Sequence, residues 1–287
     1  MKKILYLISV FTILNSCSTK GVNDPNDKPY IEKAKTNVKV SALTSDNLKI
    51  VSTKSFDNGV AISWLVKGNG EGIGKGDVVL IDYKVTLENG DIVDGNHLLK
   101  KESFPFLVGF QMQTKGWDFA LKNLKVGDFA RVKIPSNLAR GENGIRNGNS
   151  GWLIPPNADN YLSIHIISKM TPTRVIDGTK VWVFEENRKN KLKFNKKDDI
   201  VFHCMISSES NPLYTNSFRS NTPFNLTFKD KGQWPGLKKA LINAKKADRM
   251  YVVVPSSEAY STSGFEEFVK PNEDLFYNVL VLDVVKK

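Results

Sequence analysis

The chain has few of the residues that most often carry covalent or metal chemistry. Among its 287 residues are two cysteines and three histidines. His97, His165 and His203 lie far apart in the sequence and lack the spacing of metal ligands, so no metal site is predicted. Cys204 lies in an apolar run without a recognisable acid or histidine partner, so we expect a buried core residue rather than a catalytic thiol.

Long apolar runs are also missing. The longest apolar stretch near the start, Ile4 to Leu14, follows the basic pair Lys2-Lys3 and spans 11 residues. A helix of that length is too short to cross a hydrocarbon core of about 30 Å, so the pattern is typical of a secretory signal peptide.

The signal segment ends in Leu14-Asn15-Ser16-Cys17, which resembles a bacterial lipobox. The resemblance implies that Cys17 is the lipid acceptor and that residues 1–17 are a lipoprotein signal peptide. It further implies anchoring in the cell envelope, for which we expect the periplasmic side or the surface of an outer membrane. Two alternatives remain open: an ordinary cleavage site near a chance cysteine, or a chain that stays soluble. Residues 18–45 are polar and lack an apolar period, which predicts a flexible tether.

The formal charge of +11 comes from lysines and arginines spread along the chain, so the sequence does not indicate a nucleic-acid partner. The glycines between positions 68 and 76 lack the G-x-G-x-x-G spacing of a dinucleotide site. We therefore predict no cofactor.

One motif occurs twice, at a shift of about 120 residues. Asp128 to Ser136 aligns with Asp248 to Ser256 without a gap, and Gly116 aligns with Gly236. A repeat of this length indicates duplication of a whole domain. We predict one domain at 46–170 and a second at 171–287.

Each copy has the pattern of an α+β domain. Apolar residues alternate at Val79, Ile81 and Tyr83, which is the period of a strand with one buried face. Trp117, Leu121 and Leu124 have the spacing of one helix face. The predicted architecture is an antiparallel sheet curled around one short helix, in two tandem copies.

The first copy resembles the FKBP-type peptidyl-prolyl cis-trans isomerases. The resemblance rests on the joint order of several motifs, which are Gly76-Asp77, Leu87-Glu88-Asn89-Gly90, Val93-Asp94, Phe104-Pro105-Phe106, Gly116-Trp117, Val126-Gly127 and Ile154-Pro155-Pro156. It implies two FKBP-like domains and isomerisation of X-Pro bonds in proline-containing polypeptides.

By the same resemblance, Trp117 is the platform under the proline ring and Asp94 lies at the rim. The implied walls are Tyr83, Phe104, Leu153, Ile154 and Ile164. Such a site needs no acid, base or metal, because a twisted amide is less polar than a planar one and an apolar pocket favours it. Each of these residues could instead serve only the core or a turn.

The chain departs from the family's pattern at the rim. Val93 stands where an aromatic is usual, Gln113-Thr114 replaces an aliphatic pair, and Arg140 stands where a tyrosine hydroxyl normally faces the substrate. Each change makes the predicted cleft wider or more polar, which predicts weaker proline binding.

The second copy departs further. Leu237 replaces the platform tryptophan, Cys204 falls near the position of Tyr83, and Tyr214-Thr215 replaces Val93-Asp94. We expect it to be an inactive module that serves either packing or the holding of substrate. Two functions therefore remain: a lipid-anchored isomerase of exported proteins that also assists folding, or a non-catalytic FKBP-like chaperone or scaffold lipoprotein.

Overall fold

The computed structural model describes residues 48–99, 103–148, 151–185, 189–212, 214–229 and 235–287. The predicted signal peptide, Cys17 and the whole of the predicted tether lie outside these residues. The chain divides into two compact units, the first ending at Met170 and the second beginning at Thr171.

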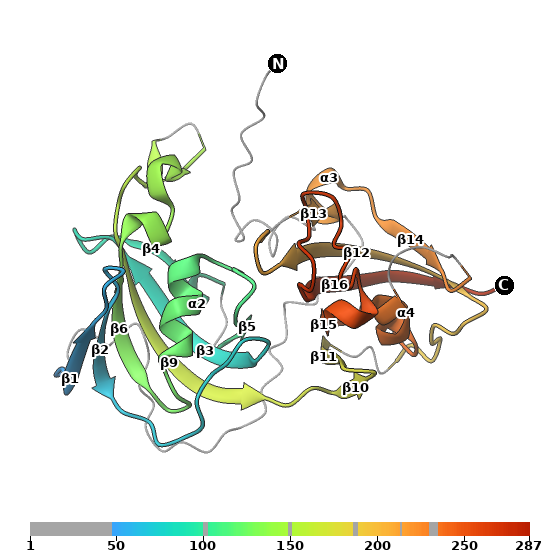
Figure 1. The fold of residues 1–287 in the computed structure, drawn as a ribbon, viewed down its shortest axis with the longest axis horizontal. Helices are drawn as coiled ribbons and strands as arrows, with labels where there is room; N and C mark the ends of the chain where they lie inside the picture. Colours follow the sequence, from blue (N-terminus) through green and yellow to red (C-terminus); the bar gives the residue numbers. More distant parts are fainter. Residues whose placement is uncertain (1–47, 100–102, 149–150, 186–188, 213, 230–234) are drawn as a thin grey trace. The chain divides into compact units, whose positions relative to one another are not determined.

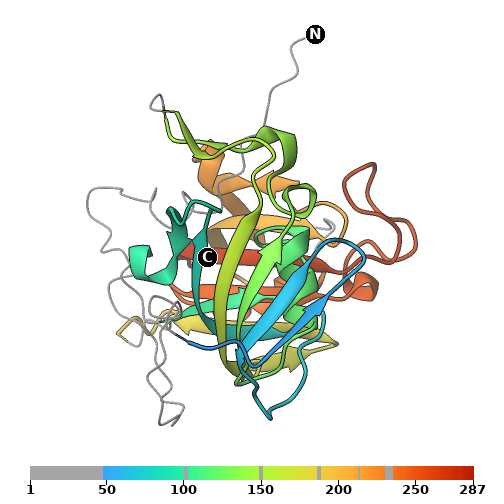
Figure 2. The same cartoon turned by 90° about the vertical axis from the view of Figure 1, so that its left-hand side faces the viewer.

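The first unit is an antiparallel sheet with the strand order β1-β2-β6-β9-β3-β4, in which β5 also pairs with β3 (Figure 1). Its strands are β1 (Ser52–Ser55), β2 (Ala61–Val66), β3 (Val78–Thr86), β4 (Ile92–Gly95), β5 (Phe104–Leu107), β6 (Phe129–Ile134) and β9 (Asn160–Met170). A separate hairpin is made by β7 (Ile145–Arg146) and β8 (Trp152–Ile154). The strands of the main sheet face the viewer in Figure 2.

Helix α2 (Lys115–Lys122) lies against this sheet (Figure 1). Three 3-10 turns accompany it: η3 (Asn96–Leu99), η4 (Ser136–Leu138) and η5 (Gly141–Asn143). The helix buries Trp117 and Leu121, as the apolar spacing predicted. It ends before Leu124, which is nevertheless buried and donates its N–H to the carbonyl of Leu121.

The second unit repeats this topology, with the strand order β10-β11-β15-β16-β12-β13 and β14 paired to β12. Its elements are β10 (Arg174–Ile176), β11 (Thr179–Glu185), β12 (Asp199–Ser208), β13 (Thr215–Asn216), α3 (Ser217–Ser220), β14 (Phe224–Thr227), α4 (Pro235–Leu241), β15 (Arg249–Val254), η6 (Ser256–Glu258) and β16 (Leu275–Val285). The antiparallel pairing predicted from the sequence is confirmed in both units. The expectation of one helix per copy was incomplete, because α3 forms a second, four-residue helix here.

The two sheets agree in register as well as in order. In the first unit Tyr83 lies opposite Ile164 and Val85 opposite Asp94. In the second unit Cys204 lies opposite Val279 and Ile206 opposite Thr215. Cys204 and Thr215 therefore take the positions of Tyr83 and Asp94, which fixes the comparison of the two sites residue by residue.

Candidate functional site in the first unit

An aromatic cluster lies where α2 faces β3 and β5. The Trp117 ring stacks on Phe106, with ring centroids 5.3 Å apart and an interplanar angle of 18°. Tyr83 meets the indole edge-to-face at 5.2 Å, and its own ring is 6.3 Å from that of Phe104. Aromatic pairs at these separations are favourable beyond their buried area. The cluster therefore holds the indole in one orientation.

The local sequence places α2 close to β6. A Cβ atom added at Gly116 would overlap the side chain of Ile134, so only glycine allows this approach. Asp118 is buried, and its two carboxylate oxygens accept the N–H groups of Gly109 and Gln111, each at 2.8 Å. These bonds tie the loop before the helix to the helix itself and so fix the position of Trp117.

Asp94 lies beside the aromatic cluster and is 7% exposed. Burial raises its pKa to about 7, against the opposing effects of the Gly95 backbone N–H, the Tyr83 hydroxyl and the charge of Arg140. The Tyr83 hydroxyl donates to Asp94 Oδ1 at 3.2 Å. Near neutral pH the carboxyl is therefore divided between its acidic and ionised forms, in contrast to an exposed aspartate.

Two residues of this site were not identified from the sequence. Phe106 supports the indole from beneath, and Asn96 Oδ1 accepts the backbone N–H of Tyr83 at 2.7 Å. Phe106 could have been found, because it stands two residues from Phe104 on one strand and therefore faces the same side. Asn96 had no signal, since its partner is 13 residues away on another element.

The polar departures at the rim are joined to each other. Arg140 Nη2 donates to Gln113 Oε1 at 2.6 Å, across 27 residues of sequence. Thr114, the residue before α2, is 9% exposed, and its hydroxyl has no hydrogen-bond partner among the described residues. The sequence suggested independent polar changes at Gln113 and Arg140, whereas the structure shows one polar bridge.

The other predicted wall residues differ in how exposed they are. Ile154, on β8, is 5% exposed, and Val93, on β4, is 9% exposed. Ile164 has no exposed surface. Leu153 is 37% exposed. Ile164 lies opposite Tyr83 on the neighbouring strand, and only Leu153 among these four offers a large accessible surface.

Access to the indole is narrow. Trp117 and Tyr83 are each 3% exposed, while Phe104, Gln113 and Arg140 are partly exposed. A polypeptide that approaches the cluster meets the partly exposed residues first. Contact with the indole then requires the rim side chains to move aside.

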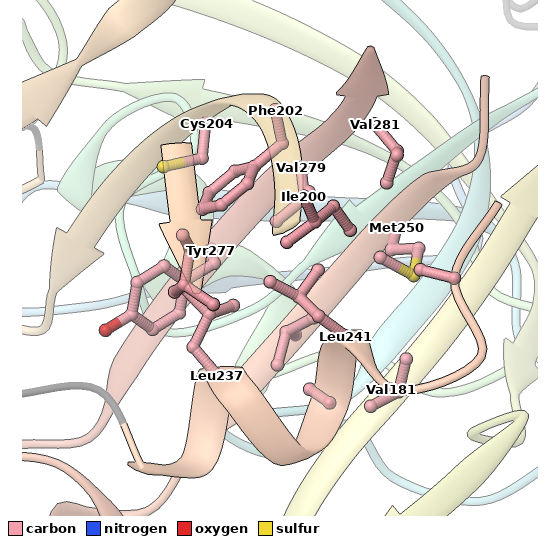
Figure 3. Packing of buried hydrophobic residues seen from close by; sticks show 14 of the residues in the cluster. Val181, Ile200, Phe202, Cys204, Leu237, Leu241, Met250, Tyr277, Val279 and Val281 are labelled. Atoms are coloured by element: carbon pink, nitrogen blue, oxygen red, sulfur yellow. The ribbon is translucent and has the colours of Figure 1, made fainter. Parts of the chain in front are cut away.

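The corresponding position of the second unit is filled by its own side chains. Leu237, Cys204 and Tyr277 belong to one buried cluster, and each is 1% exposed (Figure 3). Burial raises the pKa of the Tyr214 and Tyr277 hydroxyls well above the ordinary value, and the nearby Tyr260 hydroxyl adds to this in both cases. Tyr277 stands where the first unit has the smaller Leu162. Tyr277 lies opposite Val252, and Leu162 lies opposite Val132, the residue that corresponds to Val252 in the first unit.

Among the described residues, no three His, Cys, Asp or Glu side chains are grouped to hold a metal ion. Within the same ranges there is no apolar helix of membrane-spanning length. His165 and His203 lie on β9 and β12, and Cys204 is a buried free thiol, as its apolar surroundings predicted.

Comparison with known families identifies one fold twice in this chain. The family model described as FKBP-type peptidyl-prolyl cis-trans isomerase matches residues 70–167 and again residues 190–282. Each matched segment falls within one structural unit.

Curated relatives match parts of the chain. It is 34% identical to FK506-binding protein 1 of Candida glabrata over 116 residues, which are 40% of this chain and 96% of that protein. It is 30% identical to the Arabidopsis thaliana peptidyl-prolyl cis-trans isomerase FKBP53 over 156 residues, which are 53% of this chain but only 31% of that protein.

Solved structures that match the chain include the three FKBP domains of wheat FKBP73. That match has 22% identity and a TM-score of 0.40, and it covers 80% of this chain and 97% of the wheat chain. FkpA from Escherichia coli matches with 27% identity and a TM-score of 0.36, over 41% of this chain and 51% of its own.

Proposed function

The chain belongs to the family of FKBP-type peptidyl-prolyl cis-trans isomerases, and we propose that its first unit isomerises X-Pro bonds of exported proteins at the site of Tyr83, Asp94 and Trp117. The observation that carries the proposal is the Trp117 indole, held between Phe106 and Tyr83 next to a buried carboxyl group. The retained Gly116-Trp117 pair supports it further.

The chemistry requires a site that favours a twisted amide over a planar one. Rotation about an X-Pro bond is slow because amide resonance must be lost, at a barrier of about 18–20 kcal/mol. A planar amide is polar and well hydrated, whereas the twisted form is less so. A proline ring placed on the indole loses water from its imide, which stabilises the transition state more than the ground state.

Asp94 fits this role as a group that is readily protonated, and Tyr83 as its hydrogen-bond donor. The pKa of about 7 means that the Asp94 carboxyl carries only a partial negative charge near neutral pH. Their hydrogen bond also holds the Tyr83 ring against Trp117. We assign Tyr83, Asp94 and Trp117 to the reaction, and Val93, Phe104, Gln113, Thr114, Arg140, Leu153, Ile154 and Ile164 to the walls and rim.

The second unit is proposed to hold polypeptide without turnover. Its counterpart of Trp117 is Leu237, and the larger Tyr277 stands at the register position of Leu162. Both side chains are buried, and a closely packed interior cannot accept a proline ring without displacing them.

The test replaces the platform residue of each unit in the full-length chain. Trp117→Leu introduces the residue of the second unit and is expected to lower X-Pro exchange, measured by NMR on a short peptide, by at least about tenfold. That factor corresponds to the loss of about 1.4 kcal/mol of transition-state stabilisation. Leu237→Ala is the matched control and should leave exchange unchanged. Full activity in Trp117→Leu, with the fold intact by circular dichroism, would contradict the assignment.

A second function is favoured by one observation, the 3% exposure of Trp117. A site this closed would suit a holder, in which the rim of the first unit grips unfolded segments as a chaperone or scaffold. Absence of peptide exchange in the unaltered protein, together with suppression of aggregation of an unfolded client, would establish this alternative.

The N-terminal sequence supports a membrane tether. We propose that Cys17 receives lipid and that residues 18–45 link it to the first unit. Each buried methylene contributes about 0.8 kcal/mol, so two or more acyl chains anchor a protein stably. Cys17→Ser is expected to abolish incorporation of labelled palmitate and to release the protein from the membrane fraction; unchanged membrane association would refute the lipid anchor.

A further inference from the structure

The bridge between Arg140 and Gln113 points to a substrate class. Arg140 is partly exposed at the rim and bonds to Gln113 at 2.6 Å through Nη2. Gln113 stands four residues before Trp117, and Arg140 lies close enough to Asp94 for their charges to interact. The guanidinium is thereby placed beside the group that would receive the proline.

The positive charge of Arg140 is not matched by an ion pair. Among the described residues, no carboxylate lies within ion-pairing distance of the guanidinium, and its hydrogen bond is to a neutral amide. Asp94 faces it, but burial raises the pKa of that carboxyl to about 7, so its negative charge is only partial near neutral pH. An arginine side chain remains charged in proteins, and burial here lowers its pKa without a partner that fully compensates it.

An arginine in this position offers a planar fork of donors. One of its five N–H groups is used by Gln113, and this bond fixes the plane of the guanidinium. The remaining donors match the geometry of a carboxylate, which accepts two parallel bonds from such a fork. A tyrosine hydroxyl in the same place could offer one donor and no charge.

Resting on the function proposed above, we propose that Arg140, oriented by Gln113, selects X-Pro segments in which an acidic side chain stands next to the proline. The acidic side chain supplies the anion that the rim lacks, while the proline ring still enters the aromatic cluster. Arg140 is thus a specificity-determining residue, and Gln113 a positioning residue.

The experiment compares peptides that differ only in charge. Exchange at the X-Pro bond is measured by NMR in the full-length protein with acetyl-Ala-Glu-Pro-Phe-amide and acetyl-Ala-Gln-Pro-Phe-amide, and with a second pair in which Glu or Gln follows the proline. For at least one pair we expect kcat/KM for the Glu peptide to exceed that for the Gln peptide by about fivefold, as a partly exposed charge-assisted bond provides. The ratio should shrink at high ionic strength, because exposed charges are screened.

Two variants separate the rim from general charge effects. Arg140→Gln is expected to bring the ratio to about one while leaving the Gln peptide with measurable turnover. Arg146→Gln removes the same charge from the β7–β8 hairpin, where Arg146 stacks over Trp152 at 4.1 Å, and should leave the ratio unchanged. A ratio of one or less for both pairs in the unaltered protein, or a ratio that survives Arg140→Gln, would overturn the proposal.

The outcome remains informative if the proposed function fails. Should no peptide be turned over, the isomerase activity is refuted, and selectivity is judged from the dissociation constants of the same peptides by NMR titration. Tighter binding of the Glu peptide that is lost in Arg140→Gln would still support the acidic preference, and equal binding would reject it.

Discussion

The two units share a sheet topology and the hydrogen bonds that anchor it, which we call the frame, and they differ in the side chains that lie between sheet and helix. In both units, an aspartate just before β6 or β15 accepts a backbone N–H from the preceding loop. The Lys125 N–H donates to Asp128 at 2.9 Å, and the Lys245 N–H donates to Asp248 at 2.8 Å. The strand that carries the site is also held alike, because the Cys204 N–H donates to Ser217 at 2.8 Å as the Tyr83 N–H does to Asn96.

The side chains of the site differ between the units although the frame is the same. Trp117, Tyr83 and Asp94 of the first unit correspond to Leu237, Cys204 and Thr215 of the second. The second unit thereby lacks both the indole and the acid, and Tyr214 and Tyr260 lie close enough to Tyr277 to affect its hydroxyl. The two units thus keep the side-chain hydrogen bonds that anchor the backbone, while a small number of other side chains decide whether a site exists.

The strongest test of the shared frame changes one glycine in each unit. A Cβ at Gly116 would overlap Ile134, and a Cβ at Gly236 would overlap Val254. Gly116→Ala and Gly236→Ala should therefore each destabilise their own unit by about 3 kcal/mol, because overpacking forces the helix away from the strand.

Hydrogen exchange resolves the two units separately, since amides of β9 and β16 report local opening free energies. Faster exchange is expected in β9 alone for Gly116→Ala and in β16 alone for Gly236→Ala. Gly72→Ala is the control, because its added Cβ meets no atom within 4 Å and its φ, like those of Gly116 and Gly236, is not positive. If only one of the two helix glycines proved sensitive, the frames would not be equivalent.

A smaller effect should distinguish the units by pH. Burial raises the pKa of Asp94 from the ordinary aspartate value of 3.8 to about 7, so the folded first unit binds a proton more tightly than the unfolded chain. Its contribution to stability is therefore fully present below pH 4 and declines as pH rises towards 7. Thr215 at the same register position cannot titrate.

Asp94→Asn removes this dependence while keeping the shape of the side chain. The free energy of opening of the first unit, relative to that of the Asn variant, should fall by roughly 2 kcal/mol between pH 5 and pH 7. Exchange in β9 at the two pH values, corrected for intrinsic rates, gives this difference, and β16 in the same sample should show none. An unchanged difference would mean that Asp94 is ionised at no cost in the folded state.

Much of this architecture could be predicted because it depends on local patterns. The ungapped match of 128–136 to 248–256 indicated the duplication. The alternation at Val79, Ile81 and Tyr83 predicted a strand, which the structure confirms as part of β3. Burial of Trp117 and Leu121 followed from helix spacing. Such patterns repeat every two or four residues and need no knowledge of distant partners.

What escaped prediction depends on contacts between distant segments. Neither Gln113 nor Arg140 signals the other, because their bond joins the loop before α2 to the start of η5. The filling of the second unit by Tyr277 also depends on volumes contributed by several strands and α4. Packing of this kind is determined by three-dimensional complementarity, which periodicity does not record.

Cys204 gives the second unit a property that its counterpart lacks. The thiol is 1% exposed, and burial raises its pKa well above the ordinary cysteine value, so it is held as the unreactive thiol while β12 stays in the sheet. Opening of that strand would expose the sulfur and restore its nucleophilicity. The rate at which Cys204 is alkylated therefore measures local opening of the second unit, independently of opening in the first.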